Sequence, residues 1–337
     1  MSSPLRNLLS PEEALQKVLG EQESRKTLSF YWYFEIANPG EYRDRLFAVW
    51  DAIGVLGRIY VAGEGINAQI SVPQKNWESF VGSLTDFGLE GIRLNIAVEH
   101  HLSFIKLKIK VKAQIVADNL PLGSYDMQSV GTHLRASEFN LMIEQGANVV
   151  DMRNHYESRI GAFQNAYCPP AVTFRDELPL VREKLAGKEN EKVLLYCTGG
   201  IRCEKASAYL KAQGFKNVYQ LEGGVIKYAH DVKKEEISSL FRGKNFVFDG
   251  RMSERVTADI LSFCDICGKP GDDYHNCANL MCHRLMIACP ECVSRFRGTC
   301  STECCAITEL PEDEYKKLRS GTKSRGLGQY QRSKGVG

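Results

Sequence analysis

Leu194-Leu195-Tyr196-Cys197-Thr198-Gly199-Gly200-Ile201-Arg202-Cys203 is the stretch from which the fold can be read. Its apolar start predicts a buried strand, and the pattern over residues 204–210 predicts a helix. This order of strand, short loop and helix places the Cys197 thiol at the positive end of a helix, near the Arg202 guanidinium. Such surroundings lower a thiol pKa and bind anions. A buried strand-end cysteine is the ordinary alternative, but two glycines and an arginine in one turn favour a reactive Cys197.

Two further motifs accompany this loop within residues 130–235. Val149-Val150-Asp151-Met152-Arg153 ends one apolar strand, and Leu221-Glu222-Gly223-Gly224 ends another. Strands alternate with helical patterns, which predicts a parallel sheet covered on both faces. Together these motifs resemble the rhodanese domain. The resemblance implies a nucleophilic or persulfide-forming Cys197 and a loop-closing Arg202, with structural roles for Asp151 and Arg153. It also implies an anion-binding loop made of Thr198, Gly199, Gly200 and Ile201.

The spacing between the cysteine and the arginine separates two chemistries. Rhodanese loops place four residues there and form a small pocket for a sulfur-sized group, whereas the related phosphatases place five and form a wider cradle. Four residues lie between Cys197 and Arg202, so the sequence disfavours a phosphatase. Cys203 has two interpretations: a resolving thiol that forms a disulfide or polysulfide with Cys197, or a side chain that packs into the helix interface.

The first large region, residues 28–118, predicts a small α+β domain. An alternating aromatic segment at residues 30–34 suits a strand, and further patterns follow in the order β-α-β-β-α-β. That order is typical of a ferredoxin-like sandwich. The expected division of the chain is an N-terminal extension (1–27), this ferredoxin-like, acylphosphatase-like domain (28–118), the rhodanese domain (130–235), a cysteine-rich module (244–306) and a basic, disordered tail (307–337).

Composition and charge are those of an ordinary globular protein, with 43% hydrophobic residues, 25% charged residues and a net charge of +2. Any nucleic-acid surface must therefore be local. No apolar run has the length of a membrane span, and the N-terminus lacks a signal-peptide core, so we expect a cytoplasmic protein with no membrane partner.

Nine of the twelve cysteines lie between Cys264 and Cys305. In a reducing compartment, such crowding indicates metal binding.

The spacing of these cysteines predicts two metal sites. Two Cys-x2-Cys pairs about twenty residues apart fit a ribbon-like zinc site, because four thiolates around a tetrahedral ion need such short clips. The natural partition places Cys264, Cys267, Cys289 and Cys292 on one ion, and Cys277, Cys282, Cys300 and Cys304 on a second, with His275 or His283 as a substitute ligand. Structural zinc is the first expectation, and iron in a thiolate site is the alternative.

Four lysines alternate along one predicted strand, at Lys106, Lys108, Lys110 and Lys112. Period two places them on one face of the strand. A solvated face that also discourages strand aggregation is the ordinary interpretation, and a phosphate-contacting stripe is the other. The basic tail and the aromatic side chains of residues 30–34 tilt the balance toward RNA.

The motifs of the whole chain, in their order, give a sharper resemblance. They are Glu64-Gly65-Ile66-Asn67-Ala68-Gln69-Ile70, the Cys197 stretch continued through Glu204-Lys205-Ala206-Ser207, Gly243-Lys244-Asn245-Phe246-Val247-Phe248-Asp249, and the cysteine cluster. Over residues 28–305 the chain resembles the bacterial tRNA uridine(34) hydroxylase family. The resemblance implies oxygen-dependent hydroxylation of the wobble uridine to 5-hydroxyuridine, with molecular oxygen as co-substrate and tRNA, through its anticodon arm, as partner. DNA is not an expected partner.

Two mechanisms are compatible with these residues. The Cys197 thiolate adds to C6 of the uracil and makes C5 electron-rich, or Cys197 carries a persulfide or an oxidised sulfur. No organic cofactor is evident, because the sequence has neither a Gly-x-Gly-x-x-Gly signature nor a facial triad of metal ligands. A sulfurtransferase that passes persulfide sulfur to a protein or RNA is the alternative enzyme. An RNA-binding scaffold is a third possibility, against which the intact Cys197 loop argues.

Overall fold

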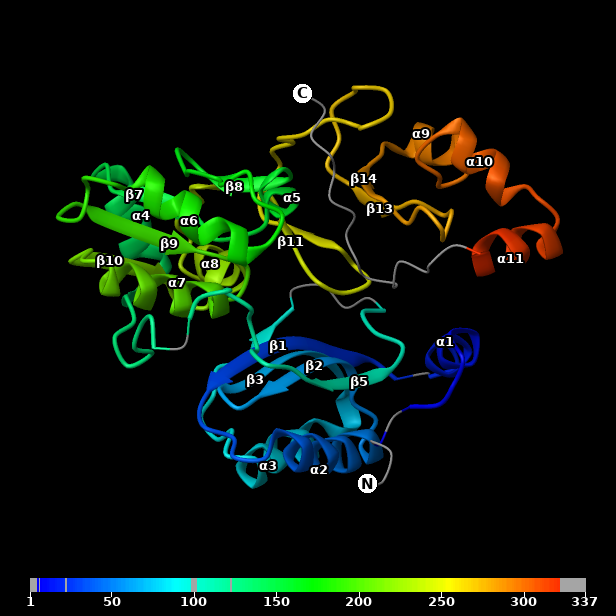
Figure 1. Ribbon diagram of the computed structural model, residues 1–337, viewed down its shortest axis with the longest axis horizontal. Coiled ribbons are helices and arrows are strands. Elements are labelled where there is room, and N and C mark those ends of the chain that lie inside the picture. Colours follow the sequence, from blue (N-terminus) through cyan, green and yellow to red (C-terminus); the bar gives the residue numbers. More distant parts are fainter. Residues whose placement is uncertain (1–4, 6, 22, 98–101, 122, 322–337) are drawn as a thin grey trace.

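We describe the protein from a computed structural model that places residues 5, 7–21, 23–97, 102–121 and 123–321. Three parts follow one another along the chain (Figure 1). A helix-backed antiparallel sheet comes first, an α/β domain with a parallel sheet follows, and a cysteine-rich part ends the described chain. No helix in these ranges has the length and apolar character needed to cross a membrane.

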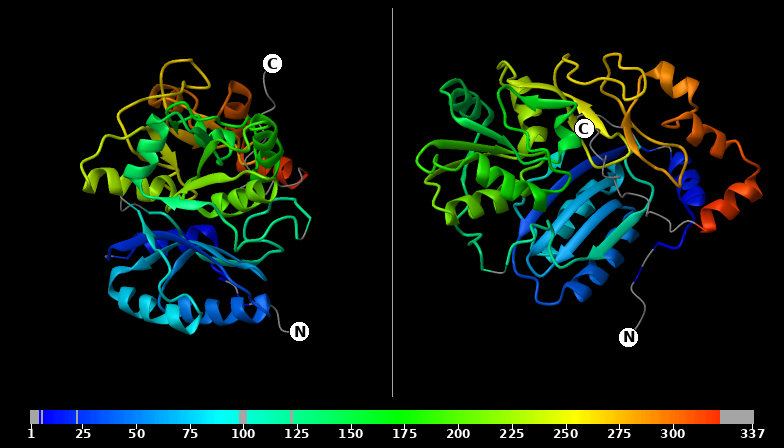
Figure 2. Two further views of the ribbon diagram at one scale, coloured as in Figure 1. Left: turned by 90° about the vertical axis from the view of Figure 1, so that its left-hand side faces the viewer. Right: turned by 45° about the horizontal axis from the view of Figure 1, so that its top comes forward.

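The N-terminal sheet has the strand order β4-β1-β3-β2-β5. The first four positions are those of the predicted β-α-β-β-α-β sandwich, and β5 is an added edge strand that runs parallel to β2. Both long helices cover one face of the sheet, and the other face is turned toward the central domain (Figure 2). The elements are β1 (Arg25–Tyr33), α2 (Pro39–Ala52), β2 (Leu56–Ala62), β3 (Gly65–Pro73), the 3-10 turn η1 (Gln74–Asn76), α3 (Trp77–Asp86), β4 (Asn95–Ile96) and β5 (Leu107–Val111).

Period-two alternation divides the side chains of this sheet between an apolar and a polar face. The face beneath α2 and α3 forms a closed core around Trp50, whose indole N–H donates to Ser83 Oγ at 3.0 Å. On the opposite face, strand pairing sets polar residues side by side in rows, for example Tyr31 beside Asn67 and Asn67 beside Tyr60. The fold therefore turns a largely polar surface toward the central domain.

The central domain has the parallel sheet that the sequence predicts, in the order β6-β10-β9-β7. Residues of β9 alternate between two cores: Val193 and Leu195 pack with α6 and α7, whereas Leu194 and Tyr196 pack with α4 and α8. The elements are β6 (Thr132–Leu134), α4 (Ala136–Glu144), β7 (Asn148–Asp151), α5 (His155–Ser158), β8 (Gly161–Phe163), α6 (Phe174–Lys184), β9 (Lys192–Tyr196), α7 (Ile201–Ala212), β10 (Asn217–Leu221) and α8 (Gly224–Lys234).

The cysteine-rich part begins inside the central domain. Its first strand, β11, pairs with β8 on one side and with β12 on the other. Segment 241–248 is therefore continuous with the rhodanese-like fold, and the cysteines follow after it. The elements are β11 (Phe241–Phe246), β12 (Ser253–Arg255), β13 (Tyr274–Asn276), β14 (Leu285–Ile287), α9 (Pro290–Arg295), α10 (Thr302–Thr308) and α11 (Glu312–Gly321).

Both ends of the described chain contain a helix. The N-terminal extension contains α1 (Pro11–Leu19), which begins with a capping box between Ser10 and Glu13. The expected disordered tail of 307–337 contains α11, so disorder is wrong for residues 312–321. Three acidic residues in the first turn of α11 and Arg319 in its last complement the helix dipole, an effect that overall composition hides. The rest of the tail, residues 322–337, lies outside the described residues.

Candidate active site at the Cys197 loop

The Cys197 loop has the strand–loop–helix form that its sequence predicts. Strand β9 ends at Tyr196, and α7 begins at Ile201 after Gly200, whose φ of 101° is a left-handed conformation that favours glycine. The Gly200 N–H donates to Cys197 Sγ at 3.1 Å. The Gly223-Gly224 turn packs against this loop, where a Cβ on Gly224 would lie 2.5 Å from the Cys197 carbonyl oxygen. The Gly199-Gly200 and Gly223-Gly224 motifs therefore both allow close backbone packing around Cys197.

The thiol of Cys197 is fully buried and acidic. Burial opposes its ionisation, but hydrogen bonding from the Cys203 thiol, the charge of Arg202 and the backbone N–H groups of residues 202 and 203 together lower its pKa to about 6. Burial and the neighbouring Cys197 sulfur raise the pKa of Cys203 well above its ordinary value. At neutral pH the pair therefore holds a thiolate at Cys197 and a neutral thiol at Cys203.

Arg202 is paired with a buried carboxylate from another element. Its guanidinium donates to both oxygens of Glu157 on α5, at 2.5 and 2.9 Å, and to Thr198 Oγ1 at 3.2 Å. Thr198 in turn donates to Glu157 at 2.9 Å. Because Glu157 neutralises Arg202, the loop is less able to hold a free anion than the arginine alone indicates. The Cys-x4-Arg spacing does not reveal this partner.

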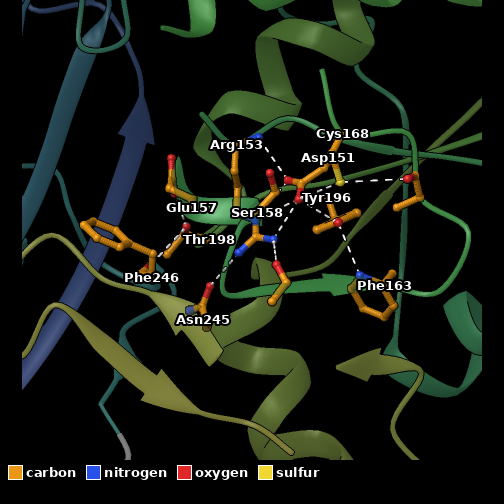
Figure 3. A network of polar contacts seen from close by, with 12 residues as sticks. Asp151, Arg153, Glu157, Ser158, Phe163, Cys168, Tyr196, Thr198, Asn245 and Phe246 are labelled. Atoms are coloured by element: carbon orange, nitrogen blue, oxygen red, sulfur yellow. Dashed lines mark hydrogen bonds and ion pairs between the residues drawn. The ribbon is translucent and has the colours of Figure 1, made fainter. Parts of the chain in front are cut away.

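Asp151 and Arg153 form a buried structural pair behind the site (Figure 3). Arg153 Nη2 lies 2.7 Å from Asp151 Oδ2 and donates to the Gly161 carbonyl at 2.6 Å. The Tyr196 hydroxyl donates to the same Asp151 oxygen at 2.7 Å. These contacts join β7, β8 and β9, and neither Asp151 nor Arg153 lines the cavity beside the loop.

A cavity of about 480 Å³ lies between the polar face of the N-terminal sheet and the Cys197 loop. The sheet supplies aromatic and amide side chains, the loop supplies backbone and Arg202, and the segment after β11 supplies a third wall. Representative lining residues are Tyr31, Tyr60, Asn67, Asn95, Thr198, Gly199, Arg202, Phe248 and Arg251. Three parts of the chain that are distant in sequence thus enclose one space.

Cys197 itself does not line this cavity. Its sulfur lies behind the loop, fully buried, whereas Thr198, Gly199, Ile201 and Arg202 reach the cavity wall. A molecule in the cavity therefore meets Thr198, Gly199, Ile201 and Arg202 first, and contact with the sulfur requires the atoms that cover it to shift. The exposure of the thiol is a property that the sequence cannot indicate.

Contacts from the N-terminal sheet hold the loop and the start of α7 in place. The Tyr31 hydroxyl donates to Glu204 Oε1 at 2.9 Å, and the Tyr33 hydroxyl donates to the Ile201 carbonyl at 3.2 Å. A Cβ on Gly200 would lie 2.7 Å from the Tyr31 hydroxyl. The aromatic segment at residues 30–34 therefore contacts the Cys197 loop and the start of α7 directly.

The eight cysteines predicted to bind metal form two sets of four. In each set the sulfur atoms all lie within 4.8 Å of one another. Individual separations are 3.7 Å for Cys267–Cys289, 3.7 Å for Cys282–Cys300 and 3.6 Å for Cys300–Cys304. The sets are Cys264, Cys267, Cys289 and Cys292, and Cys277, Cys282, Cys300 and Cys304. Each set could hold a metal ion; neither His275, His283 nor Cys305 belongs to one.

Comparison with known proteins assigns each part of the chain to a family model. Residues 25–115 match the UPF0176 acylphosphatase-like domain, residues 135–231 the rhodanese-like domain, and residues 242–305 the rhodanese C-terminal model. The tRNA uridine(34) hydroxylase of Leptospira interrogans is 49% identical over 321 residues, covering 94% of this chain and 88% of that one. The enzyme of the same name from Salmonella arizonae is 46% identical over 335 residues, covering 98% and 95%.

The chain belongs to the tRNA uridine(34) hydroxylase family. Among solved structures, the rhodanese-like domain of an Anabaena protein matches at a TM-score of 0.27 and 17% identity, over 34% of this chain and 80% of that one.

In this member of the tRNA uridine(34) hydroxylase family, several site residues escape sequence reasoning. Glu157 follows the Asp151–Arg153 motif and Asn95 lies in a predicted strand, but only the fold shows that they reach the Cys197 loop. Glu177 on α6 is fully buried, and neither of its carboxylate oxygens has a hydrogen-bond partner among the residues that the structure describes. Burial raises the pKa of Glu177 well above its usual range, although the charge of Arg202 opposes the shift. The Glu177 carboxyl therefore stands close enough to Arg202 and Cys197 to feel their charges.

Proposed function

We propose that this chain hydroxylates the wobble uridine, position 34, of tRNA to 5-hydroxyuridine. The observation that carries the proposal is the cavity beside an acidic thiol, in a chain that belongs to this family. Its volume is in the range of small-molecule sites. Aromatic rings and carboxamides line it, and enzymes that modify a base use such groups to stack and hydrogen-bond an extruded nucleotide. A uridine that leaves the anticodon loop would enter between the N-terminal sheet and the Cys197 loop.

The edge of the N-terminal sheet supports an approach by the anticodon arm. Lys108 and Lys110 are exposed on β5, and strand pairing places Arg58 beside Lys108. Lys112 lies with Nζ 5.7 Å from the centre of the Tyr60 ring. Burial and the charges of Lys108, Lys112 and Arg58 lower the pKa of Lys110, as expected in a concentrated positive patch. A basic strand edge beside aromatic side chains suits single-stranded RNA. Lys106 instead donates to the Leu9 carbonyl.

Cys197 supplies the nucleophile in the proposed chemistry. Its thiolate adds to C6 of uracil, and the ring becomes electron-rich at C5. Molecular oxygen is the co-substrate: one atom enters at C5 and the other leaves as water, so each turnover consumes two electrons and two protons from an external donor. Elimination of the thiolate from C6 then restores the ring. Because Cys197 is fully buried, addition requires the atoms that cover Sγ to move first.

Persulfide transfer is the second candidate. A thiolate that accepts backbone N–H groups, as Cys197 does from Gly200, is also suited to carry a sulfane sulfur. The pairing of Arg202 with Glu157 weighs against it, because the guanidinium is no longer a free anion site. Hydroxylation needs oxygen, whereas sulfur transfer needs a sulfur donor, so the two reactions have different requirements.

Nucleoside mass spectrometry separates the candidates. Bulk tRNA is digested from cells that lack this protein and carry either the wild type, Cys197→Ala or, as a control, Cys305→Ser. We expect 5-hydroxyuridine with the wild type and the control, none with Cys197→Ala, and one labelled oxygen after growth under heavy oxygen gas. Unchanged 5-hydroxyuridine accompanied by loss of thiolated nucleosides would replace hydroxylation with sulfur transfer.

Both cysteine sets are proposed to hold zinc with a structural role. A tetrahedral ion with Zn–S bonds of about 2.3 Å places its sulfur atoms about 3.8 Å apart, close to the 3.6 and 3.7 Å separations found here. In an iron–sulfur cluster the four thiolates are shared among two or four irons, so at least some of them must lie farther apart. The residues therefore fit one ion in each set. For the whole protein, the cytoplasm, where tRNA is modified, is the expected location.

A further inference from the structure

Asn95 stands at one end of a row of polar side chains that crosses the N-terminal sheet. Strand pairing sets it beside Ser29, and continues through Gln69 and Arg58 to Lys108 at the basic edge. Residues paired in this way lie on the same face. Four strand-to-strand steps of about 4.8 Å separate the two ends by roughly 19 Å. The row therefore leads along the cavity floor from the exposed cations to the Cys197 loop.

The side chain of Asn95 reaches this loop and is left without a partner. A Cβ on Gly199 would lie 3.8 Å from Asn95 Nδ2, and the residue, 8% exposed, lines the cavity. Among the described residues none makes a hydrogen bond to its carboxamide. Because Asn95 lines the cavity, its carboxamide is placed to meet a molecule that occupies this space.

Three neighbouring polar side chains are already engaged. Gln69 Nε2 donates to Asn67 Oδ1 at 2.6 Å, and Asn67 Nδ2 donates to the Ile115 carbonyl at 3.4 Å. The Tyr31 hydroxyl is taken by Glu204. Asn95 differs from these residues because both its donor and its acceptor remain available beside the reactive loop.

We propose that Asn95 is a specificity residue that binds the edge of the uracil ring through its carboxamide. Uracil presents an N3–H between two carbonyl oxygens, and a carboxamide complements that edge: Oδ1 accepts from N3–H while Nδ2 donates to a carbonyl. This inference rests on the proposed function, because it takes uridine as the occupant of the cavity. To the proposed function it adds Asn95 as the group that holds the uracil ring against the Cys197 loop.

Binding of synthetic anticodon stem–loops by the full-length protein tests the proposal without turnover. Three RNAs are compared by fluorescence anisotropy: one with uridine at position 34, one with an abasic site there, and one with N3-methyluridine. Asn95→Ala should weaken binding of the uridine RNA by roughly 10- to 100-fold, the usual worth of a two-bond base contact. It should leave binding of the abasic RNA unchanged. The methyl group should weaken binding strongly in the wild type and little in Asn95→Ala.

Two further variants keep the test decisive. Asn95→Asp has nearly the same volume but lacks the donor, and should also weaken binding of the uridine RNA only. Asn190→Ala changes an exposed asparagine outside the cavity and should behave as the wild type. Equal binding of all RNAs by Asn95→Ala, Asn95→Asp and the wild type would overturn the role of Asn95, as would equal weakening of the uridine and abasic RNAs. If the wild type itself does not distinguish uridine from an abasic site, the proposed function fails instead.

Discussion

Lys205 Nζ lies 2.9 Å from Glu64 Oε2, across the boundary between the central domain and the N-terminal sheet. Lys205 is fully buried, and it also contacts Asp118 Oδ2 at 3.1 Å and donates to the Val116 carbonyl at 2.9 Å. Its helix, α7, begins directly after the Cys197 loop. The ion pair therefore ties the reactive loop to the sheet that forms the other wall of the cavity.

Replacing Lys205 should separate the two walls. Lys205→Met leaves Asp118 buried without its cation, so we expect the free energy of unfolding to fall by roughly 3–5 kcal/mol. Urea denaturation followed by tryptophan fluorescence measures the change. Lys216→Met, at an exposed position in the same domain, is the control. Adding Asp118→Asn should restore part of the loss in Lys205→Met; an unchanged midpoint for Lys205→Met would show that the ion pair does not stabilise the fold.

The acidity of Cys197 predicts the pH dependence of its alkylation. With a pKa of about 6, iodoacetamide labelling should rise with pH through a midpoint near 6, below the usual thiol value of about 8.5. Because ionisation is easier in the folded state, the associated stability is fully present above the unfolded pKa and is lost as pH falls through the folded one. Cys203→Ala removes the thiol donor and should move the midpoint upward. Peptide mass spectrometry follows the label, and a wild-type midpoint near 8.5 would contradict the proposed activation.

Metal analysis tests the two cysteine sets separately. The purified untagged protein should contain two zinc ions per chain. Cys292→Ser and Cys277→Ser should each lower the content by one ion, since they belong to different sets. Cys305 follows Cys304 in sequence but belongs to neither set, so Cys305→Ser should retain both ions. Plasma mass spectrometry gives the count; loss of both ions in either single variant would argue for one joint site.

Charge reversal at the sheet edge tests the path of the RNA. Lys108→Glu and Lys110→Glu should each weaken binding of an anticodon stem–loop, and each should lower the slope of log affinity against log salt by about 0.7 for every phosphate that the protein no longer neutralises. Lys234→Glu, an exposed lysine near the end of α8, should leave the slope unchanged. Equal effects of all three variants would indicate general attraction rather than a defined path.

Local sequence patterns determined much of this protein. The Cys197 loop, the order of the ferredoxin-like strands and the two cysteine sets all follow from alternation or from short spacings, in which nearby residues carry the information. The expectation for the tail was wrong over residues 312–321 because it rested on composition. Composition suggested disorder, whereas the distribution of charge along these residues supports α11.

Only the tertiary structure decided what surrounds the reactive sulfur. Tyr31 and Glu204 are separated by 173 residues and meet at 2.9 Å. Glu157 neutralises Arg202, and Asn95 arrives from a strand two residues long. These contacts depend on how helices and loops of the central domain pack against one another and against the N-terminal sheet. The alternation within a strand says which side a residue faces but not what stands opposite. The acidity of the thiol is thus local in origin, whereas the cavity beside the Cys197 loop is a product of domain packing.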